Sequence, residues 1–326
     1  MNILVVNHYV GTPKDGMGNR HYMFAKELMS RGHHVTILTS SFGHKTRKEK
    51  VPLAKGEQWK KETVEGVPFV WVRTPQYIGN GLDRIWNMLY FAYRTMISFK
   101  KFQIERPDIV VGSSPHLFAA LSAQKLAKKL GVPFVLEIRD LWPESLIELG
   151  DFSRRNPGIL VMEAIERHLY RSADHIICLL PGGIEHISYK GGNKGKITWV
   201  PNGIDLKLVP IPQPLQRTDS KFTVMYAGAH GLANGLDSIL DAAAFIQSKG
   251  LGDKVCFRFI GDGPEKVRLQ QRTEQEDLRL VTFEPFVPRS EIYGYLQEAD
   301  AIVITLKDAV LFKRYGISPN KLFDYM

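Results

Sequence analysis

Short apolar runs alternate with helical periods along this chain, and that alternation constrains the fold more than any other feature. In the first 205 residues the strand-like runs are 3–7, 34–39, 69–73, 109–112, 134–138, 175–180 and 197–200. Most are continuous and apolar, as the strands of a parallel sheet covered on both faces are. Helical periods at 21–31 and 116–130 separate some of them. The pattern predicts an α/β fold.

The alternation restarts after residues 208–216, which contain three prolines and no periodic signal and therefore predict a linker. Beyond them, strands are expected at 222–227, 255–260, 280–283 and 301–305, and helices at 236–249, 265–275 and 289–299. Because 326 residues are too many for one ordinary core, we predict two doubly wound, Rossmann-like domains, 1–205 and 206–326. Such a domain normally continues for another strand or two, so we expect the C-terminal domain to be truncated.

Targeting signals and cysteine usage indicate a cytoplasmic protein. The chain has no apolar run of membrane-spanning length, and its first six residues enter a strand without a basic, cleavable leader. Cys178 and Cys256 each lie in an apolar strand-like run, which is typical of reduced core thiols rather than of a disulfide or a metal pair.

The net charge of +9 is confined to the first half of the chain. Residues 1–205 carry 28 basic and 19 acidic side chains, whereas residues 206–326 carry 15 of each. The asymmetry points to a polyanionic partner, which is a nucleic acid, an anionic membrane surface or a lipid-linked diphosphate. Charge alone leaves these open, but no nucleic-acid-binding module is recognised, so we expect no nucleic-acid partner.

The segment 85–102 has the pattern of an amphipathic helix. Its apolar stripe consists of Ile85, Met88, Leu89, Ala92, Met96 and Phe99. Such a helix fits a membrane surface beside a lipid-linked acceptor, and it fits equally a helix packed on its own core. The basic first half, with its cluster at 45–61, favours peripheral contact with an anionic membrane.

The last residues of the chain read as a helix start that binds an anion. Ser318 is a fitting N-cap and Pro319 a fitting first helical residue, so free backbone N–H groups face whatever lies ahead. Lys321 adds a cation in the first turn, and Asp324 adds an acceptor suited to two ribose hydroxyls. Together they predict a site for a nucleoside diphosphate, and the alternative is an ordinary capped helix.

Loops that follow strands carry the other candidates, because ligands of open α/β sheets bind beyond the carboxyl ends of the strands. His116 and Asp140 follow the runs at 109–112 and 134–138. The glycine-rich candidates are Gly16, Gly18 and Asn19 in the first half, and Gly228, His230, Gly231 and Gly261 in the second. The spacing at 16–18 is not that of a dinucleotide fingerprint, which argues against a nicotinamide enzyme.

Several motifs occur in the order found in one family. They are RGHHVT at 31–36, PNGID at 201–205, GLD at 235–237, GDGP at 261–264 and SPNKLFDYM at 318–326. With the two β/α halves and the early glycine loop, the chain resembles glycosyltransferase family 4, whose fold is GT-B. The run RDLWPES at 139–145 is similar to the branch that builds bacterial O-antigen and capsule sugars, which includes N-acetylfucosaminyl transferases.

The resemblance implies that the C-terminal half holds a nucleotide-sugar, the N-terminal half holds the acceptor, and transfer retains configuration without a metal or cofactor. By position, Asp324 matches the family glutamate that binds the ribose, and Gly16 with Gly18 faces the diphosphate from the opposite domain. The implied donor-binding set is Gly16, Gly18, Asn19, Gly228, His230, Gly231, Gly261, Arg314, Ser318, Asn320, Lys321 and Asp324.

The chain also departs from the family pattern. The partner acid expected eight positions before Asp324 is Gly316, and the usual basic pair of the donor loop falls on Ala229 and Asn234. His230, Lys321 and Arg314 are then left to balance the phosphate charge. His116 lies near the position of the family's catalytic histidine.

We therefore expect catalytic roles for His116, Asp140 and Lys321. Lys321 stabilises the leaving diphosphate, and Asp140 contacts hydroxyls of the acceptor or sugar. The predicted function is transfer of a sugar, UDP-linked in the donor, to a polyprenyl-diphosphate-linked glycan at the inner face of the plasma membrane. The alternative is a non-catalytic, glycosyltransferase-like binding protein.

Overall fold

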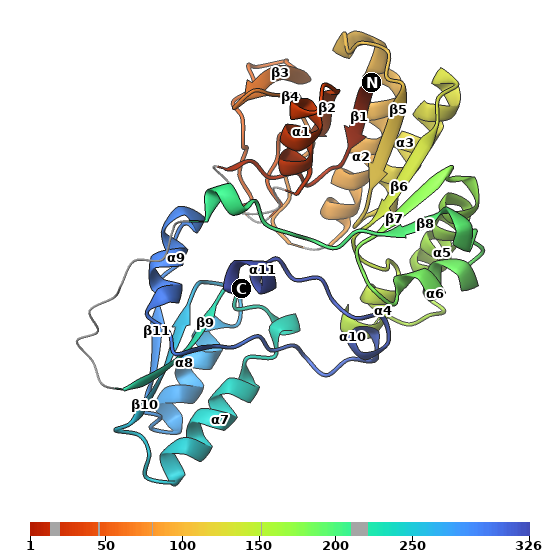
Figure 1. The fold of residues 1–326 in the computed structure, drawn as a ribbon. Coiled ribbons are helices and arrows are strands. Elements are labelled where there is room, and N and C mark those ends of the chain that lie inside the picture. The colour runs from red at the N-terminus through yellow and green to blue at the C-terminus, as the bar shows by residue number, and fades with distance from the viewer. Residues whose placement is uncertain (14–19, 45, 80, 151, 210–220) are drawn as a thin grey trace. The chain divides into compact units, whose positions relative to one another are not determined.

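The computed structural model describes residues 1–13, 20–44, 46–79, 81–150, 152–209 and 221–326. The chain forms two compact units (Figure 1). The first contains Met1–Pro201 and Arg314–Ile317, and the second contains Asn202–Lys313 and Ser318–Met326. The chain therefore leaves the first unit, builds most of the second and returns for four residues. The candidates Gly16, Gly18 and Asn19, and most of the predicted linker, lie outside the described residues.

The first unit is built on an eight-stranded sheet of order β3-β4-β2-β1-β5-β6-β7-β8. Its strands are β1 (Asn2–Val6), β2 (His34–Ser40), β3 (Trp59–Val64), β4 (Val67–Val72), β5 (Ile109–Ser113), β6 (Phe134–Ile138), β7 (His175–Cys178) and β8 (Ile197–Trp199). Neighbouring strands are parallel except β3 and β4. All seven expected strands of this half are present.

The sequence pattern missed β3, whose residues WKKETV are mostly polar. It is an edge strand, so it needs only one partner and no apolar face on both sides. A hairpin at Glu65 and Gly66, both with positive φ, connects it to β4. This two-residue turn was the signal that could have revealed it.

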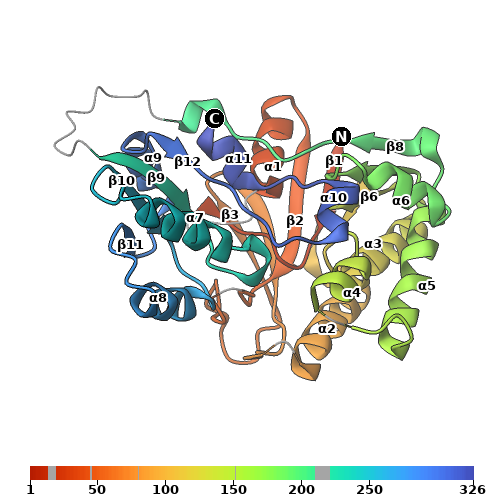
Figure 2. The ribbon, with the colours of Figure 1, turned by 90° about the horizontal axis from the view of Figure 1, so that it is seen from below.

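Helices of the first unit cover the sheet on its faces (Figure 2). They are α1 (Arg20–Ser30), α2 (Leu82–Ser98), α3 (Leu117–Leu130), α4 (Glu144–Gly150), α5 (Pro157–Ser172), α6 (Gly183–Tyr189) and the end of α10 (Val310–Tyr315). α1 packs on β2, whereas α2 and α5 both pack on α3, which lies on β5. Val5, Ile37 and Trp71 belong to a core cluster that includes Tyr22 and Ala25 of α1.

The predicted apolar stripe of α2 is divided between a buried and an exposed side of the helix. Met88 and Phe99, which the stripe placed together with Leu89, are buried, while Leu89 is exposed. The core-facing side also carries Asn87, Phe91, Thr95 and Ser98. Because successive residues turn by about 100°, the opposite side holds a second apolar row of Leu82, Ile85, Trp86, Leu89, Tyr93, Met96 and Ile97, all exposed. A helix with two apolar sides gives no single stripe in the sequence.

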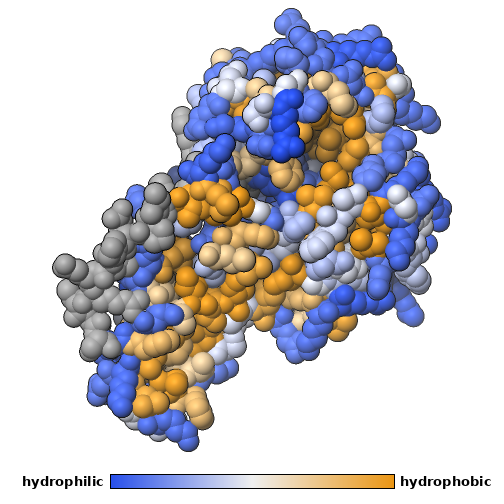
Figure 3. All heavy atoms as spheres, viewed as in Figure 1, coloured by the Kyte–Doolittle hydropathy of each residue, from blue (hydrophilic) through white to orange (hydrophobic). Residues whose placement is uncertain are grey.

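The second unit contains a four-stranded parallel sheet of order β11-β10-β9-β12. Its strands are β9 (Phe222–Ala227), β10 (Val255–Ile260), β11 (Val281–Glu284) and β12 (Ala301–Ile302), and its helices are α7 (Asp237–Ser248), α8 (Lys266–Gln275), α9 (Arg289–Gln297) and α11 (Asn320–Tyr325). The four strands and the three helices expected between residues 222 and 305 are confirmed. Figure 3 shows apolar residues on the surface of this unit, where Leu232 and Phe245 are among the exposed ones.

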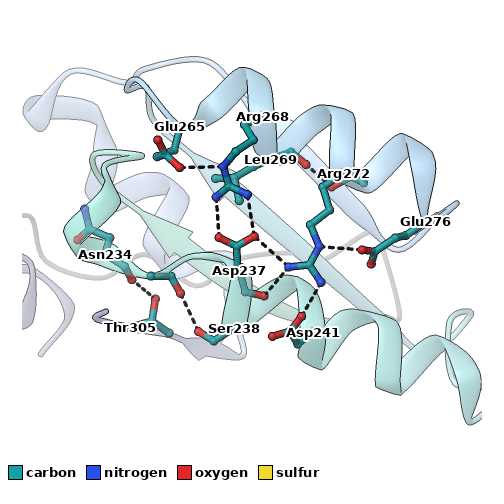
Figure 4. A network of polar contacts seen from close by, with 12 residues as sticks. Asn234, Asp237, Ser238, Asp241, Glu265, Arg268, Leu269, Arg272, Glu276 and Thr305 are labelled. Atoms are coloured by element: carbon teal, nitrogen blue, oxygen red, sulfur yellow. Dashed lines mark hydrogen bonds and ion pairs between the residues drawn. The ribbon is translucent and has the colours of Figure 1, made fainter. Parts of the chain in front are cut away.

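A network of ion pairs joins α7 and α8 on the surface of the second unit (Figure 4). Arg268 donates to both carboxylate oxygens of Asp237, at 2.6 and 3.0 Å, and Arg272 donates to Asp237 at 2.9 Å and to Asp241 at 2.5 Å. The hydrogen bonds from Arg268, ahead of those from Arg272, lower the pKa of Asp237. Isolated exposed pairs contribute at most about 1 kcal/mol each, whereas a bidentate pair within a network, as here, is the arrangement in which exposed pairs do stabilise.

Both sheets reverse their strand order at one place, between β1 and β5 in the first unit and between β9 and β12 in the second. Ligands of open α/β sheets bind beyond the carboxyl ends of the strands at such switch points. Asn7 follows β1, Ser114 follows β5 and Gly228 follows β9. A ligand site is therefore expected in the loops that follow β1, β5 and β9.

We expect two glycine substitutions to have opposite effects on stability. A Cβ at Gly112 of β5 would lie 2.8 Å from the Cβ of Ala123 and 2.9 Å from Phe134, so Gly112→Ala should destabilise by about 1–3 kcal/mol through overpacking. Gly294, inside α9, has open space around it, and Gly294→Ala should stabilise by about 0.5–1 kcal/mol. Urea unfolding of both variants measures the difference, and equal effects would contradict the packing described for α3.

Candidate functional site

A buried carboxylate organises the strand ends of the first unit. Glu137, the fourth residue of β6, is 2% exposed. Its Oε1 accepts a hydrogen bond from Arg20 Nε at 2.9 Å, and its Oε2 accepts one from Ser113 Oγ at 2.6 Å and lies 2.6 Å from His21 Nε2. Burial alone would raise the pKa of Glu137, but His21, Arg20 and Arg139 outweigh it and hold the pKa below its usual range. The carboxylate is therefore ionised and fully compensated.

Arg20 extends this cluster to the point where the chain leaves the first unit. Its two terminal nitrogens donate to the carbonyl oxygens of Pro201 at 2.6 Å and Val200 at 3.0 Å. Glu137, Arg20 and His21 were not among the residues predicted from the sequence. A charged residue inside an apolar strand was the available signal, since it demands a buried partner.

His116, predicted to be catalytic, is buried at the start of α3 and paired with a second histidine. Its Nδ1 accepts a hydrogen bond from the backbone N–H of Ala119 at 3.3 Å, and its Nε2 lies 2.6 Å from Nδ1 of His8. Burial, reinforced by Arg84 and His44, lowers the pKa of His116 to about 3. His8 was not among the predicted residues. It lies two residues beyond the end of β1, in the region where ligands of such sheets bind.

Asp140, the other acidic candidate of this unit, is exposed two residues beyond the end of β6. The neighbouring Arg139 is half-buried and its backbone N–H donates to Ser114 Oγ at 2.8 Å. The structure therefore brings His116 and the Glu137 cluster to the carboxyl ends of β5 and β6, with Asp140 at the solvent side of the same edge.

In the second unit two glycine loops pack directly against each other. Gly228 follows β9 and Gly261 follows β10, and the Gly228 N–H donates to the carbonyl of Ile260 at 2.9 Å. Gly261 has φ +137°, and a Cβ on it would lie 2.0 Å from the carbonyl oxygen of Gly228. These glycines are therefore required by the contact between the loops. Gly231 precedes the 3-10 turn Leu232–Asn234.

His230 lies between the loops and is fully buried. Its ring is surrounded by the rings of Tyr226, Phe259 and Phe283, and neither of its nitrogens has a hydrogen-bond partner among the described residues. Burial lowers its pKa to about 4. The side chain is neutral at pH 7, so it adds no positive charge to the loops.

Lys321 on α11 reaches the same place. Its Nζ donates to Tyr226 OH at 2.8 Å and to Asn234 Oδ1 at 3.0 Å, and it stands 4.3 Å from the centre of the Tyr226 ring. A Cβ on Gly228 would lie 3.5 Å from this nitrogen. Burial lowers the pKa of Lys321 to about 8. No carboxylate pairs with it among the described residues.

The expected capping role of Ser318 was wrong. α11 begins at Asn320 with Pro319 at the N-cap, and no side chain caps it. Ser318 Oγ instead accepts the backbone N–H of Asn202 at 2.8 Å. The chain re-enters the second unit at Ser318, beside Asn202, the residue at which that unit begins. With six residues, α11 is too short for its N-terminus to act as an anion site by itself. Asn320 is exposed.

Asp324 and Tyr325 anchor α11 on the rest of the second unit. Asp324 is half-buried, and its Oδ1 accepts a hydrogen bond from Tyr293 OH at 3.3 Å. Tyr325 OH binds both the N–H and the carbonyl of Ala227 at the end of β9. Lys321 and Asp324 therefore come from one short helix fixed beside the Gly228 loop.

Arg314 was expected in the C-terminal domain, but residues 314–317 belong to the first unit. The carbonyl of Tyr315 accepts the Gly182 N–H at 2.9 Å, and Arg314 is exposed with its guanidinium 5.3 Å from the Tyr315 ring. Gly316 has φ +73°, and a Cβ there would lie 2.6 Å from Pro181. A glycine in place of the expected acid is thus a requirement of this packing.

The described part of the chain has no group of three His, Cys, Asp or Glu side chains placed to hold a metal ion. Both cysteines are free thiols; Cys178 is buried, as predicted, whereas Cys256 is half-buried, and burial raises the pKa of Cys178 to about 11. Within the described ranges, no helix has the length and apolar character needed to cross a membrane.

Residues 15–203 match the model of the glycosyl transferase 4-like domain, and residues 210–319 match the model of glycosyl transferases group 1. The chain belongs to the glycosyl transferase 4-like family. A curated relative from Escherichia coli (strain K12), the putative colanic acid biosynthesis glycosyl transferase WcaI, is 24% identical, the match covering 95% of this chain and 79% of that protein.

Solved structures agree on the fold. The solved structure described as trehalose-6-phosphate from E. coli bound with UDP-2-fluoro glucose superposes with a TM-score of 0.68 at 10% identity, covering 94% of this chain and 78% of that one. Anabaena Alr3699/HepE in complex with UDP and glucose has a TM-score of 0.60 at 16% identity, covering 94% and 74%. The predicted GT-B fold with two Rossmann-like domains is confirmed.

Proposed function

We propose that this glycosyltransferase moves a sugar, with retention of configuration, from a UDP-sugar to a polyprenyl-diphosphate-linked glycan during assembly of a bacterial surface polysaccharide such as O-antigen or capsule. The relative named for colanic acid biosynthesis supports the pathway type, and the similar structures with bound UDP and UDP-2-fluoro glucose support the donor. The second unit binds the donor and the first unit binds the acceptor.

The observation that carries this proposal is the environment of Lys321. Among the residues that the structure describes, the contacts of the ammonium group are two neutral oxygens and an aromatic ring, at the carboxyl end of β9 beside the Gly228 loop. A half-buried cation without a carboxylate is costly, and an incoming diphosphate would compensate it. Its lowered pKa expresses the same cost.

Lys321 then stabilises the diphosphate as it leaves. A retaining transfer needs no nucleophile from the protein, because the leaving phosphate can accept the acceptor's proton while fixed charges stabilise the growing negative charge. The loops at Gly228, Gly231 and Gly261, together with Asn320, complete the donor site. His116 and Asp140 act on the acceptor side, in the first unit.

We expect Lys321→Met to weaken UDP binding about 10- to 100-fold, as loss of a hydrogen bond to a charged group does. In the unmodified protein the affinity should fall as the pH rises through about 8, because unliganded Lys321 then loses the proton that the diphosphate requires. The variant should lack this dependence. Titration calorimetry between pH 7 and 9 measures both effects.

Lys249→Met is the matched control, since Lys249 is exposed and also lies over an aromatic ring, 5.2 Å from the centre of Phe245. Its UDP affinity should equal that of the unmodified protein at every pH. A normal affinity in the Lys321 variant would remove the observation on which the proposal stands.

Asp324 is proposed to bind the ribose hydroxyls, since it lies one helical turn from Lys321 and is half-buried. Asp324→Ala should weaken UDP binding by about 1–3 kcal/mol. Tyr293→Phe removes the hydroxyl that donates to Asp324 and keeps the carboxylate, so its loss should be smaller. If both variants bind UDP normally while folded, the ribose assignment fails.

Activity should not require a metal ion. The protein is incubated with radiolabelled UDP-sugars and a bacterial lipid-linked glycan extract in excess chelator, and transfer of the label is measured. The anomeric configuration of the product is determined separately by NMR. Full activity with a retained anomer is the expected result. Loss of activity that magnesium or manganese restores would contradict metal independence, and UDP binding without transfer would favour the non-catalytic binding protein.

The apolar row on α2 is proposed to contact an anionic membrane. Its side chains are large and well exposed, for example Trp86 at 58% and Ile97 at 50%. Lys100 and Lys101, both exposed, follow directly in the next turn, and the first half of the chain carries the whole basic excess. Exposed aromatic and aliphatic side chains beside lysines suit the interface of an anionic bilayer.

We expect the double substitution of Trp86 and Ile97 by serine to reduce sedimentation with vesicles of phosphatidylcholine and phosphatidylglycerol. Both side chains are exposed, so the fold should persist. The control is serine at Leu160 and Val161 of α5, which are exposed at 52% and 56%. Equal binding by both double variants would show that α2 is not the contact.

A further inference from the structure

Two histidines form a buried pair at the switch point of the first unit. His8 follows β1 and His116 follows β5, and each is 1% exposed. Their rings meet edge to face, with centroids 4.7 Å apart, and His8 Nδ1 lies 2.6 Å from His116 Nε2. One hydrogen bond therefore joins the two rings.

The contact at Ala119 decides which way this hydrogen bond points. His116 Nδ1 accepts the Ala119 N–H, so it carries no proton, and a neutral imidazole then has its proton on Nε2. That Nε2–H donates to His8 Nδ1, which must be the bare nitrogen of His8. The proton of His8 consequently lies on Nε2.

His8 Nε2 is buried and has no hydrogen-bond partner among the residues that the structure describes. A buried donor without a partner costs about 1–3 kcal/mol. The ring cannot turn freely to relieve this, because it is stacked between Tyr9 and Phe91, with both centroids 4.5 Å away. The His116 contact fixes it within that plane.

The surroundings of the pair are positive. His44 and Tyr77 continue the aromatic cluster, with Arg47 over the Tyr77 ring at 4.5 Å. Burial lowers the pKa of His8 most, and His116, Lys50, His44 and Arg84 all lower it further. A neutral N–H donor in a positive field is suited to an anionic oxygen.

We propose that His8, through its Nε2–H, binds a phosphate oxygen of the acceptor's diphosphate, and that His116 is a positioning residue that fixes the tautomer of His8. The inference rests on the proposed function for the identity of the acceptor. The ligand contact is thus assigned to His8, which the fold places beside His116, and not to His116, which the sequence indicated.

Two asparagine variants separate these roles. His8→Asn keeps an oxygen near the position of Nδ1, where it can accept from His116, and it removes the Nε2–H. His116→Asn keeps a good N-cap for α3 and removes the hydrogen bond to His8. Circular dichroism and thermal melting check that both variants fold.

Calorimetry is carried out with saturating UDP present, using inorganic diphosphate and farnesyl diphosphate as probes. We expect His8→Asn to weaken binding about tenfold or more, and His116→Asn to weaken it less, since the donor remains but is no longer oriented. Binding of both probes means that the diphosphate suffices, and binding of farnesyl diphosphate alone, lost in His8→Asn, means that a lipid-linked source is needed. Binding of neither probe, or unchanged binding in His8→Asn, overturns the proposal.

The positioning role has its own readout. The ¹⁵N shifts of imidazole-labelled protein report the tautomer, and His8 should be protonated at Nε2 in the unmodified protein and a mixture in His116→Asn. Protonation of His8 at Nδ1 would overturn the proposal. Failure of the proposed function is distinguishable, because it removes UDP binding and leaves the His8 tautomer as it is.

Discussion

The ionised carboxylate of Glu137 is the interaction on which the first unit depends. It joins α1, β5 and β6 through Arg20, His21 and Ser113, and Arg20 carries the connection on to the carbonyls of Val200 and Pro201. Removing one partner of a buried charge leaves the other uncompensated, which costs far more than the pair contributes. The cluster thus fixes the strand ends around His8 and His116 and the point at which the chain leaves the unit.

The second unit differs in that its half-buried charge is a cation, for which the proposed function supplies an anionic ligand. Lys321 is held by Tyr226 and Asn234, neither of which neutralises it. The departures from the family pattern gain a physical meaning here. Asn234 occupies a place where a basic residue is usual, and it supplies an oxygen to Lys321 and an amide donor to Ala229. The Asn234 oxygen thereby positions the Lys321 ammonium group.

The two units therefore present different groups at equivalent places, the carboxyl ends of parallel strands at a switch point. The second offers a charged ammonium, whose attraction for phosphate is strong and little oriented. The first offers neutral imidazoles in a positive field, where direction and tautomer decide what is bound. Under the proposed function, this difference suits a donor whose diphosphate must leave and an acceptor that must be oriented.

The β/α alternation, the two Rossmann-like halves, and the candidacy of Lys321 and the glycine loops could be predicted from the sequence alone. These features are local periodicities and spacings. Only the tertiary structure decided which distant residues meet: His8 with His116, Glu137 with Arg20, and Ser318 with Asn202. It also decided that residues 314–317 return to the first unit, where Gly316 fits against Pro181. Contacts across more than a hundred positions depend on strand order and crossovers, and no local pattern records them.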